Sequence, residues 1–268
     1  MTEIHEAERL LHTVFARSLR KPFRKAIEEY RLLRPGDRVA ACISGGKDSM
    51  LLAMLLRDLS RELPFEPTYL AMDPGYTPEH RREVEGNAAH LGLRLHVFET
   101  NVLRVAGNHA PEHPCFLCAK MRRGHLYAEA QRLGCNKIAL GHHFDDAVES
   151  VLMGLLYGGQ VQAMLPRLRS KNYPDMELIR PMYLIRERAV QEWAEAAGLT
   201  FSSCGCPAAK REEDTKRAEV KALIAGLAEK NPQIEKNILN AVKSVDTRKV
   251  LGWRDAAGKH SFLDSFEE

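Results

Sequence analysis

The sequence has no long hydrophobic run. Nowhere do its apolar residues continue for the ~20 positions that a membrane-spanning helix needs. The first residues, Met1 to Glu6, are acidic and lack the charged-then-apolar order of a signal peptide. These absences argue against a membrane protein and a secreted protein, so we expect the chain to be cytoplasmic.

The sequence also has little net charge, because 39 Lys and Arg residues are opposed by 36 Asp and Glu, which leaves +3. A charged partner would therefore have to be bound by local clusters. Residues 20–38 contain seven basic side chains against three acidic ones, and residues 117–137 contain five against one. A third basic stretch includes Arg167, Arg169 and Lys171. Such runs are usually solvated faces, but together they are compatible with binding the phosphates of a structured RNA.

Cysteine is scarce as well, with six residues that are not expected to form disulfides in a reducing compartment. Four of them form two close pairs, Cys115 with Cys118 and Cys204 with Cys206, and this pairing suggests a metal or a cluster. Structural zinc, a redox dithiol and an iron–sulfur cluster are the three interpretations, and spacing alone favours zinc. The other two cysteines, Cys42 and Cys135, are most simply small core residues.

Strand and helix patterns alternate along most of the chain. Residues 3–34 have helical spacing that Pro22 interrupts. We then expect strands at 38–43, 67–73, 94–99 and 136–141, and helices at 50–60, 78–91, 119–133 and 144–157. This alternation predicts an α/β fold, a doubly wound parallel sheet with an N-terminal helical segment and C-terminal helices.

The remaining segments extend this organisation. Residues 158–182 break the alternation and predict a short hairpin, and three helices are expected at 186–197, 212–229 and 232–246, while 252–268 is weakly patterned. We predict three parts: an N-terminal helical segment (1–34), a central α/β domain with the paired cysteines (35–210) and a C-terminal helical region (211–268).

The most informative motif follows the first predicted strand and reads Ser44-Gly45-Gly46-Lys47-Asp48-Ser49. A glycine turn between a buried strand and a helix places free backbone N–H groups at the positive end of the helix dipole, where an anion such as phosphate binds. Lys47 adds a charge, and the hydroxyls of Ser44 and Ser49 add donors. The spacing differs from that of the commoner phosphate loop, which needs four residues between its first glycine and Gly-Lys-Ser/Thr.

A second motif, Gly141-His142-His143-Phe144-Asp145-Asp146, closes the fourth predicted strand and begins the next helix. Carboxylates at a helix start can serve simply as caps that favour its dipole. For Asp145 this interpretation stays open, whereas Asp146 is favoured as functional. The two histidines are more often packed or capping residues than ligands, and neither is assigned a role.

The first motif resembles the signature of the PP-loop family, whose members use ATP to adenylate a carbonyl or carboxylate and release pyrophosphate. Further stretches resemble the tRNA 2-thiocytidine synthetase branch of that family: Cys115-Phe-Leu-Cys118-Ala-Lys-Met-Arg122-Arg123-Gly124, Ile138-Ala-Leu-Gly141-His142-His143-Phe144-Asp145-Asp146 and Leu156-Tyr157-Gly158-Gly159. The similarity covers about residues 35–210, which is most of the chain.

The resemblance implies a site for each reactant. ATP would be bound by Ser44, Gly45, Gly46, Lys47, Asp48, Ser49, Met72, Gly141 and Asp146, with Mg²⁺ beside the triphosphate. Asp48, Arg122 and Asp146 would be catalytic, although Arg122 can also be read as part of a solvated helix face. A [4Fe–4S] cluster with one open iron would be held by Cys115, Cys118 and Cys206, with Cys204 as the alternative third ligand because this chain reads Cys-Gly-Cys.

The activity implied by the resemblance is ATP-dependent tRNA thiolation. The C2 oxygen of a cytidine would be adenylated and then replaced by sulfur delivered at the cluster. The partners would be tRNA, a sulfur donor (a cysteine desulfurase or sulfide) and a second copy of the chain. The alternatives are tRNA 2-thiouridine synthesis, a PP-loop enzyme for a small molecule, and a zinc-stabilised nucleotide-binding module without catalysis. The thiouridine branch usually has terminal cysteine-rich zinc ribbons, and this chain has no cysteine before Cys42 or after Cys206.

Overall fold

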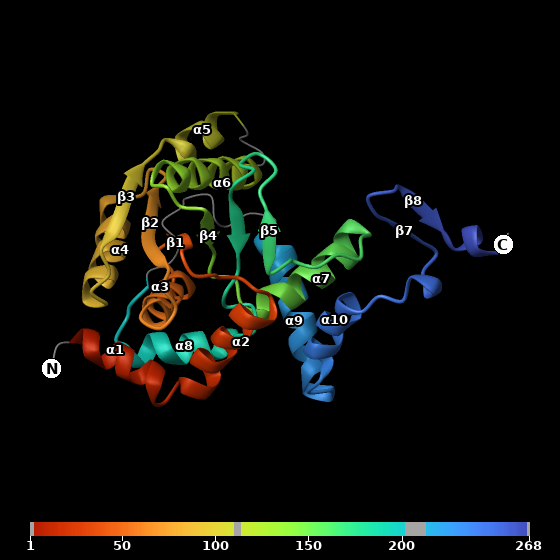
Figure 1. The fold of residues 1–268 in the computed structure, drawn as a ribbon, viewed down its shortest axis with the longest axis horizontal. Coiled ribbons are helices and arrows are strands. Elements are labelled where there is room, and N and C mark those ends of the chain that lie inside the picture. The colour runs from red at the N-terminus through yellow and green to blue at the C-terminus, as the bar shows by residue number, and fades with distance from the viewer. Residues whose placement is uncertain (1–2, 110–113, 202–212, 267–268) are drawn as a thin grey trace. The chain divides into compact units, whose positions relative to one another are not determined.

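A six-stranded sheet in the order β3-β2-β1-β4-β6-β5 forms the centre of the fold (Figure 1). The structure is a computed structural model, and it describes residues 3–109, 114–201 and 213–266. All neighbouring strands run parallel except β5 and β6, which are antiparallel. The predicted α/β fold with a parallel sheet is therefore confirmed, with one antiparallel strand at its edge. The strands are β1 (Arg38–Ile43), β2 (Glu66–Asp73), β3 (Leu95–Glu99), β4 (Lys137–Ala139), β5 (Arg167–Arg169) and β6 (Glu177–Ile179).

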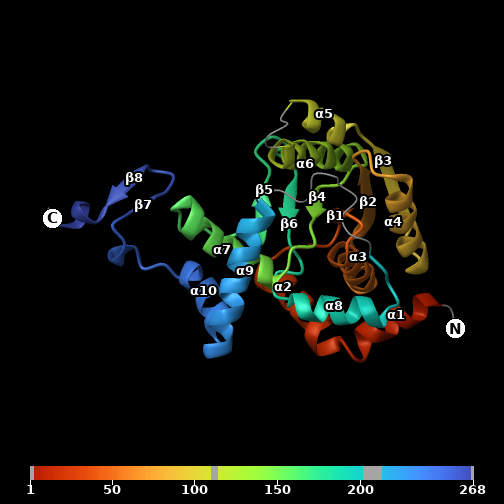
Figure 2. The same ribbon diagram turned by 180° about the vertical axis from the view of Figure 1, so that it is seen from behind.

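Helices cover both faces of this sheet, because successive residues of a strand point to opposite faces. Three residues of β1 share one hydrophobic core with α3 (Lys47–Ser60), and two share a second core with α6 (Pro114–Arg132). The first set is Val39, Ala41 and Ile43, and the second is Ala40 and Cys42. Figures 1 and 2 show α3 and α6 on opposite sides of the strands. The two cores explain why β1 is a continuous apolar run.

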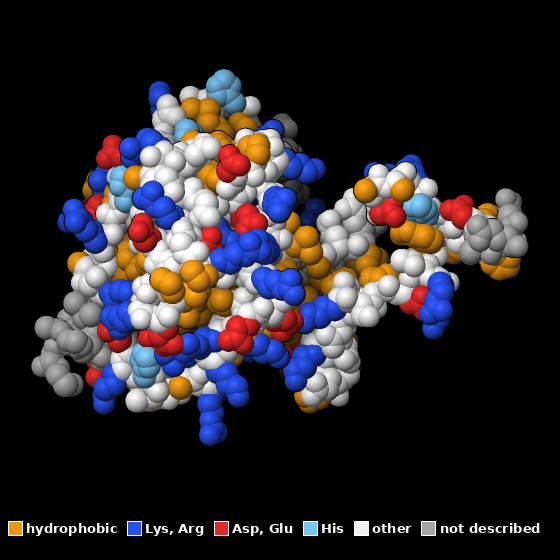
Figure 3. Space-filling view, in the orientation of Figure 1, with side chains coloured by type: hydrophobic (Ala, Val, Ile, Leu, Met, Phe, Trp, Pro, Cys, Tyr) orange, Lys and Arg blue, Asp and Glu red, His pale blue; other side chains and the backbone are white. Residues whose placement is uncertain are grey.

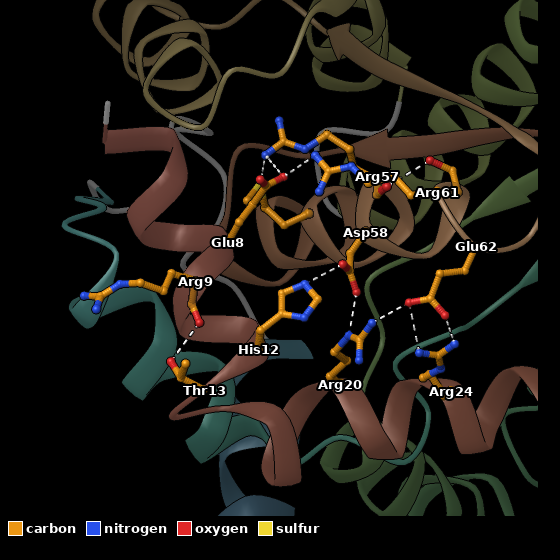
Figure 4. A network of polar contacts seen from close by, with 12 residues as sticks. Glu8, Arg9, His12, Thr13, Arg20, Arg24, Arg57, Asp58, Arg61 and Glu62 are labelled. Carbon is orange, nitrogen blue, oxygen red and sulfur yellow. Dashed lines mark hydrogen bonds and ion pairs between the residues drawn. The ribbon is translucent and has the colours of Figure 1, made fainter. Parts of the chain in front are cut away.

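The N-terminal segment packs against the far end of α3. It consists of α1 (Glu3–His12), a π-helical turn (Ala16–Arg20) and α2 (Lys21–Glu29), so Pro22 lies in the first turn of a helix, where its missing N–H is tolerated. Figure 4 shows His12 and Arg20 pointing toward Asp58 of α3. His12 Nε2 lies 2.7 Å from one carboxylate oxygen of Asp58, and Arg20 Nε lies 2.8 Å from the other.

Several elements differ in length from the prediction. Helix α3 begins at Lys47 rather than residue 50, and α6 begins at Pro114 rather than 119, while β4 is shorter than the predicted 136–141. The predicted hairpin is present as β5 and β6, and β6 joins the main sheet beside β4. The helix α5 (Val102–His109) was not predicted, nor were the paired strands β7 (Gly252–Arg254) and β8 (Lys259–Ser261).

By its internal contacts the chain divides into two compact units. The first comprises residues 1–147 and 164–217 and contains the six-stranded sheet, and the second comprises residues 148–163 and 218–268. No helix in the described part of the chain has the length and apolar character to span a membrane. The division at 34/35 and 210/211 remains a prediction. The other helices are α4 (Pro78–His90), α7 (Phe144–Gly158), α8 (Glu187–Ala196), α9 (Glu213–Lys230) and α10 (Ile234–Lys243).

Candidate active site

The glycine loop, residues 44–49, joins the end of β1 to the start of α3. Gly46 is the N-cap of α3, and no described side chain caps this helix end. Gly45 has a φ of +92°, and a Cβ there would lie 2.5 Å from Cγ2 of Val84 on α4. A side chain at this position would thus be strained by the backbone and would clash with a neighbour. The backbone N–H groups at the start of α3 form the anion site that the sequence predicts.

The two serines of the motif hold the loop together. Ser49 is buried, and its hydroxyl donates to the Gly46 carbonyl at 2.9 Å. The same oxygen accepts from the Ser44 backbone N–H at 3.2 Å, while the two hydroxyls lie 3.3 Å apart. Ser49 therefore shapes the loop from inside, a role distinct from direct contact with a phosphate.

Lys47 and Asp48 provide the charges of the loop. The Lys47 ammonium lies 3.5 Å from Oδ1 of Asp48 and 3.4 Å from Oε1 of Glu187 at the start of α8. Burial raises the pKa of Asp48, and the positive charge of Lys47 opposes this effect. The loop thus combines one partly shielded cation with a carboxylate whose protonation is eased by its surroundings.

His143 connects Asp48 to the second motif. It is buried, and its Nδ1 accepts from the Asp146 backbone N–H at 3.3 Å while Asp146 Oδ2 accepts from the His143 backbone N–H at 2.9 Å. This is the reciprocal arrangement of a capping box, with histidine at the N-cap of α7. Because Nδ1 accepts, the neutral ring carries its proton on Nε2, which lies 3.9 Å from Asp48 Oδ1. The sequence analysis assigned His143 no role, since a histidine cap has no strong sequence signal.

The two acidic residues of this motif differ in their partners. Asp145 Oδ2 accepts from the Glu187 backbone N–H at 2.8 Å, and its other oxygen lies 3.0 Å from Arg186 Nη2. Asp145 therefore caps α8, a helix distant in the sequence, rather than α7, the helix in which it lies. Asp146 uses Oδ2 for the cap, and its other oxygen, Oδ1, lies 2.5 Å from Nη2 of Arg217. Arg186, Glu187 and Arg217 were not predicted as site residues.

Gly141 brings the end of β4 against the loop. A Cβ at this position would lie 3.0 Å from the backbone carbonyl carbon and oxygen of Asp48 and 3.2 Å from the Ser49 nitrogen. These are backbone atoms that cannot swing aside, so a larger residue would push the β4 end away from α3. Close packing with α3 is therefore a reason for glycine here, beside the nucleotide contact expected from the resemblance.

Met72 and Arg122 lie on the β2 side of the loop. Met72 is buried near the end of β2 and lines a small pocket together with Ser44, Tyr76 and Val84. Arg122 of α6 donates from Nη2 to the Tyr76 hydroxyl at 3.3 Å. The first motif follows β1, Met72 lies near the end of β2, and Gly141 and Asp146 follow β4, while Arg122 contacts Tyr76 just after β2. These predicted residues thus lie at or beside the carboxyl ends of three strands, where ligands bind in open α/β sheets.

The cysteines are described only in part. Cys115 and Cys118 lie at the start of α6, inside the helix rather than before it, and Cys118 is half-buried. Cys204 and Cys206 lie outside the described residues, as does the side chain of Cys115, so the predicted cluster is not tested by the geometry. Residues three apart on a helix share a face, so the Cys115–Cys118 spacing fits two ligands of one centre.

The remaining two cysteines, Cys42 and Cys135, are buried in the core beneath α6, as predicted. Burial raises the pKa of Cys42 to about 12, and burial also raises that of Cys135. Both thiols therefore stay protonated at neutral pH and are unsuited to be nucleophiles or ligands.

Comparison with known proteins identifies the family. Residues 11–210 match the PP-loop domain. The chain belongs to the PP-loop family. Curated PP-loop relatives include the tRNA-cytidine(32) 2-sulfurtransferases of Syntrophotalea carbinolica, 37% identical and aligned over 88% of this chain and 92% of the relative, and of Geobacter sulfurreducens, 35% identical over 85% and 89%.

Among solved structures, the U34-tRNA thiolase NcsA from Methanococcus maripaludis with its [4Fe-4S] cluster has a similar fold. The two structures align with a TM-score of 0.65 over 85% of this chain and 79% of the thiolase, at 20% sequence identity. At that identity the similarity concerns the fold, and it confirms the α/β architecture of the PP-loop domain.

Proposed function

We propose that this PP-loop protein is an ATP-dependent tRNA sulfurtransferase that replaces the C2 oxygen of a cytidine by sulfur and so forms 2-thiocytidine. The observation that carries the proposal is the anion site at the start of α3, formed with Gly45 and Lys47, in a chain that is 34–37% identical to tRNA-cytidine(32) 2-sulfurtransferases. The anion site and the relatives are both needed for the argument. The anion site supports phosphate binding, and the relatives support a tRNA cytidine as the acceptor of sulfur.

The activation step assigns work to the glycine loop. The N–H groups at the start of α3 and the Lys47 ammonium bind the triphosphate of ATP, and the β2 end at Met72 receives the adenine. The C2 oxygen of the cytidine attacks the α-phosphorus, and pyrophosphate leaves. Asp48 and Asp146, joined through His143, would hold Mg²⁺ or take up a proton, since carboxylate oxygens are the ligands that Mg²⁺ prefers. Arg122 adds a positive charge near the adenylate.

The sulfur step relies on the cysteines. Cys115 and Cys118 at the start of α6, with Cys206 as third ligand and Cys204 as its alternative, would hold a [4Fe–4S] cluster. A cluster with three protein ligands supplies an open, Lewis-acidic iron at which sulfide from a sulfide or cysteine-desulfurase donor can be presented. The start of α6 favours thiolates, because the N-terminal end of a helix stabilises negative charge.

The basic surface available for RNA is smaller than the basic runs in the sequence indicated, because several of these side chains form ion pairs. Arg20 and Arg24 pair with Asp58 and Glu62, and the buried Lys137 pairs with Glu177. Figure 3 shows basic and acidic side chains interspersed over the visible face of the α/β unit. Arg38 pairs with Glu66 of β2. The remaining exposed cations of the first run are Lys21, Lys25, Arg31 and Arg34. We assign the phosphate contacts of the tRNA to these and to α6.

The second unit exposes apolar side chains that a partner would cover. Leu155, Leu156 and Val161 are exposed near the end of α7, and Leu223 and Leu227 are exposed on α9. Exposed apolar residues in such number are typical of an interaction surface. We propose that a second copy of the chain covers them, and light scattering of the purified protein tests this homodimer. The enzyme would act in the cytoplasm, where its tRNA substrate is found.

Nucleoside analysis of tRNA tests the proposed function. Cells that lack the protein are expected to lose 2-thiocytidine and to regain it when the gene is restored. Unchanged 2-thiocytidine would overturn the proposal, and loss of 2-thiouridine instead would assign the chain to uridine. The matched control restores the gene with a lysine-to-alanine change at Lys47. This variant removes the positive charge of the glycine loop and leaves the cysteines intact, so it isolates the contribution of the loop.

A further inference from the structure

Arg180 lies at the same edge of the sheet as the glycine loop. It directly follows Ile179, the last residue of β6, and β6 runs parallel beside β4. The Leu140 N–H donates to the Ile179 carbonyl at 3.0 Å, so the two strand ends stay together as far as Leu140, two residues before His142. Across this edge the order is β2, β1, β4, β6. Arg180 is therefore on the side of the loop opposite the β2 pocket.

The Arg180 side chain is buried and forms no ion pair with the described part of the chain. The residue is 7% exposed, and its Nη1 donates to the Leu165 carbonyl. Its Nε is buried and has no hydrogen-bond partner among the described residues, and no Asp or Glu in the described ranges forms an ion pair with it. A buried cation without an anion is unfavourable unless something supplies one.

The same pair of strands shows how the fold usually compensates such a charge. Lys137 at the start of β4 is 3% exposed, and its ammonium lies 2.7 Å from Glu177 and 3.4 Å from Asp37. Strands β4 and β6 thus bury one cation at their amino ends with two carboxylates and another at their carboxyl ends with none. The cation without an ion-pair partner, Arg180, lies at the end of the sheet where ligands bind.

The groups around Arg180 reinforce a positive site. Burial and, to a smaller extent, the charge of Arg123 lower the pKa of Arg180 to about 10, so the guanidinium is still charged at neutral pH. The Nδ1 atom of His142 is also buried without a partner among the described residues. Burial and the charge of Arg180 lower the pKa of His142 to about 4, which keeps the ring neutral. Asp146 faces this group as well, but its oxygens are bound by the His143 N–H and Arg217.

We propose that Arg180 and His142 form a second anion subsite, which binds a phosphoryl oxygen on the acceptor side of the glycine loop. A phosphoryl oxygen can accept from the Arg180 Nε–H and from the His142 ring together, and it replaces the carboxylate that the fold omits. The phosphoryl group belongs either to a phosphodiester of the bound RNA or to the nucleotide. This inference rests on the proposed function for the identity of the RNA, but not for the presence of the subsite.

Binding measurements on full-length protein test the subsite without requiring thiolation. The probes are a non-hydrolysable ATP analogue and unmodified tRNA, measured separately with wild type, R180M and R180K. We expect R180M to weaken one probe by about tenfold or more while the other stays within about twofold, and R180K to lose less. If the tRNA is affected, the slope of affinity against salt should also fall by about one.

Two further results make the test decisive. If R180M folds and both probes bind within about twofold of wild type, the subsite is refuted and Arg180 serves only the Leu165 carbonyl. If R180M does not fold, R180K decides by the same criterion. The matched control is K137M, which removes the compensated cation of the same strands: it should lower Tm and leave both affinities unchanged. Nucleoside analysis is scored apart, so failure of thiolation and failure of the subsite are distinguishable.

Discussion

The ammonium group of Lys47 lies 3.4 Å from Oε1 of Glu187, a residue 140 positions later in the chain. Glu187 begins α8, and Asp145 of α7 accepts from its backbone N–H. One lysine of the glycine loop is thus connected to two helices that lie outside the motif. A triphosphate that binds Lys47 has to displace this carboxylate or share the ammonium with it.

Removing the charge of Glu187 should therefore strengthen nucleotide binding. In E187Q the side chain keeps its shape but no longer competes for Lys47 or repels phosphate, so the affinity for an ATP analogue should rise about threefold to tenfold, roughly 1 kcal/mol. Equilibrium dialysis measures the change. E192Q on the same helix is the control, because Glu192 pairs with the exposed Arg188, and this variant should bind the analogue like wild type. Weaker binding by E187Q would show that Glu187 positions Lys47 instead.

A glycine-to-alanine change at Gly45 tests the loop geometry. The new Cβ meets Cγ2 of Val84 and the backbone φ is positive, so G45A should lose about 2 to 4 kcal/mol of unfolding free energy. Denaturant titration gives the value. G36A is the matched control: Gly36 has a φ of +84° with open space around its Cβ, and it should lose only about 1 kcal/mol. Adding V84A to G45A should recover the part due to the clash, and no recovery would disprove the clash.

The elements and motif of this fold were largely predictable because their signals are local. The apolar run before Ser44 and the turn glycines after it specify a strand, a loop and a helix within a few residues. Glu187, Arg217 and His143 could not be found in this way, since each acts through a contact with a residue on another element or through an unusual cap. Likewise, the local charge of residues 20–38 could not reveal that Asp58 of α3 and Glu62, just after this helix, neutralise part of it.

The Asp58 network predicts a dependence of stability on pH. Burial raises the pKa of Asp58, but the hydrogen bond and charge of Arg20 and the charge of His12 lower it overall. A group with a lowered folded-state pKa stabilises the fold above its unfolded pKa, about 4, and loses this contribution as the pH falls further. D58N should cost about 2 kcal/mol at pH 7, and its difference from wild type should shrink below about pH 4.

Urea titrations across that pH range measure this difference. The control is E6Q, because Glu6 forms an exposed pair with Arg9 on α1, and the stability of this variant should stay close to that of the wild type at every pH. A D58N effect that is equally large at acid and neutral pH would mean that the amide disturbs packing and that the carboxylate charge contributes nothing.

The cysteine assignment makes the last prediction. In anaerobically purified protein, C115A and C118A should each lose bound iron, sulfide and the absorbance of an iron–sulfur cluster, because a cubane with only two protein thiolates is not retained. C206A should also lose the cluster, whereas C204A should keep it, if Cys206 is the third ligand. Loss of the cluster in C204A and its retention in C206A would make Cys204 the third ligand instead. C135A is the control, since its thiol is buried in the core and should not affect iron content. Zinc in place of iron in the wild type would refute the cluster.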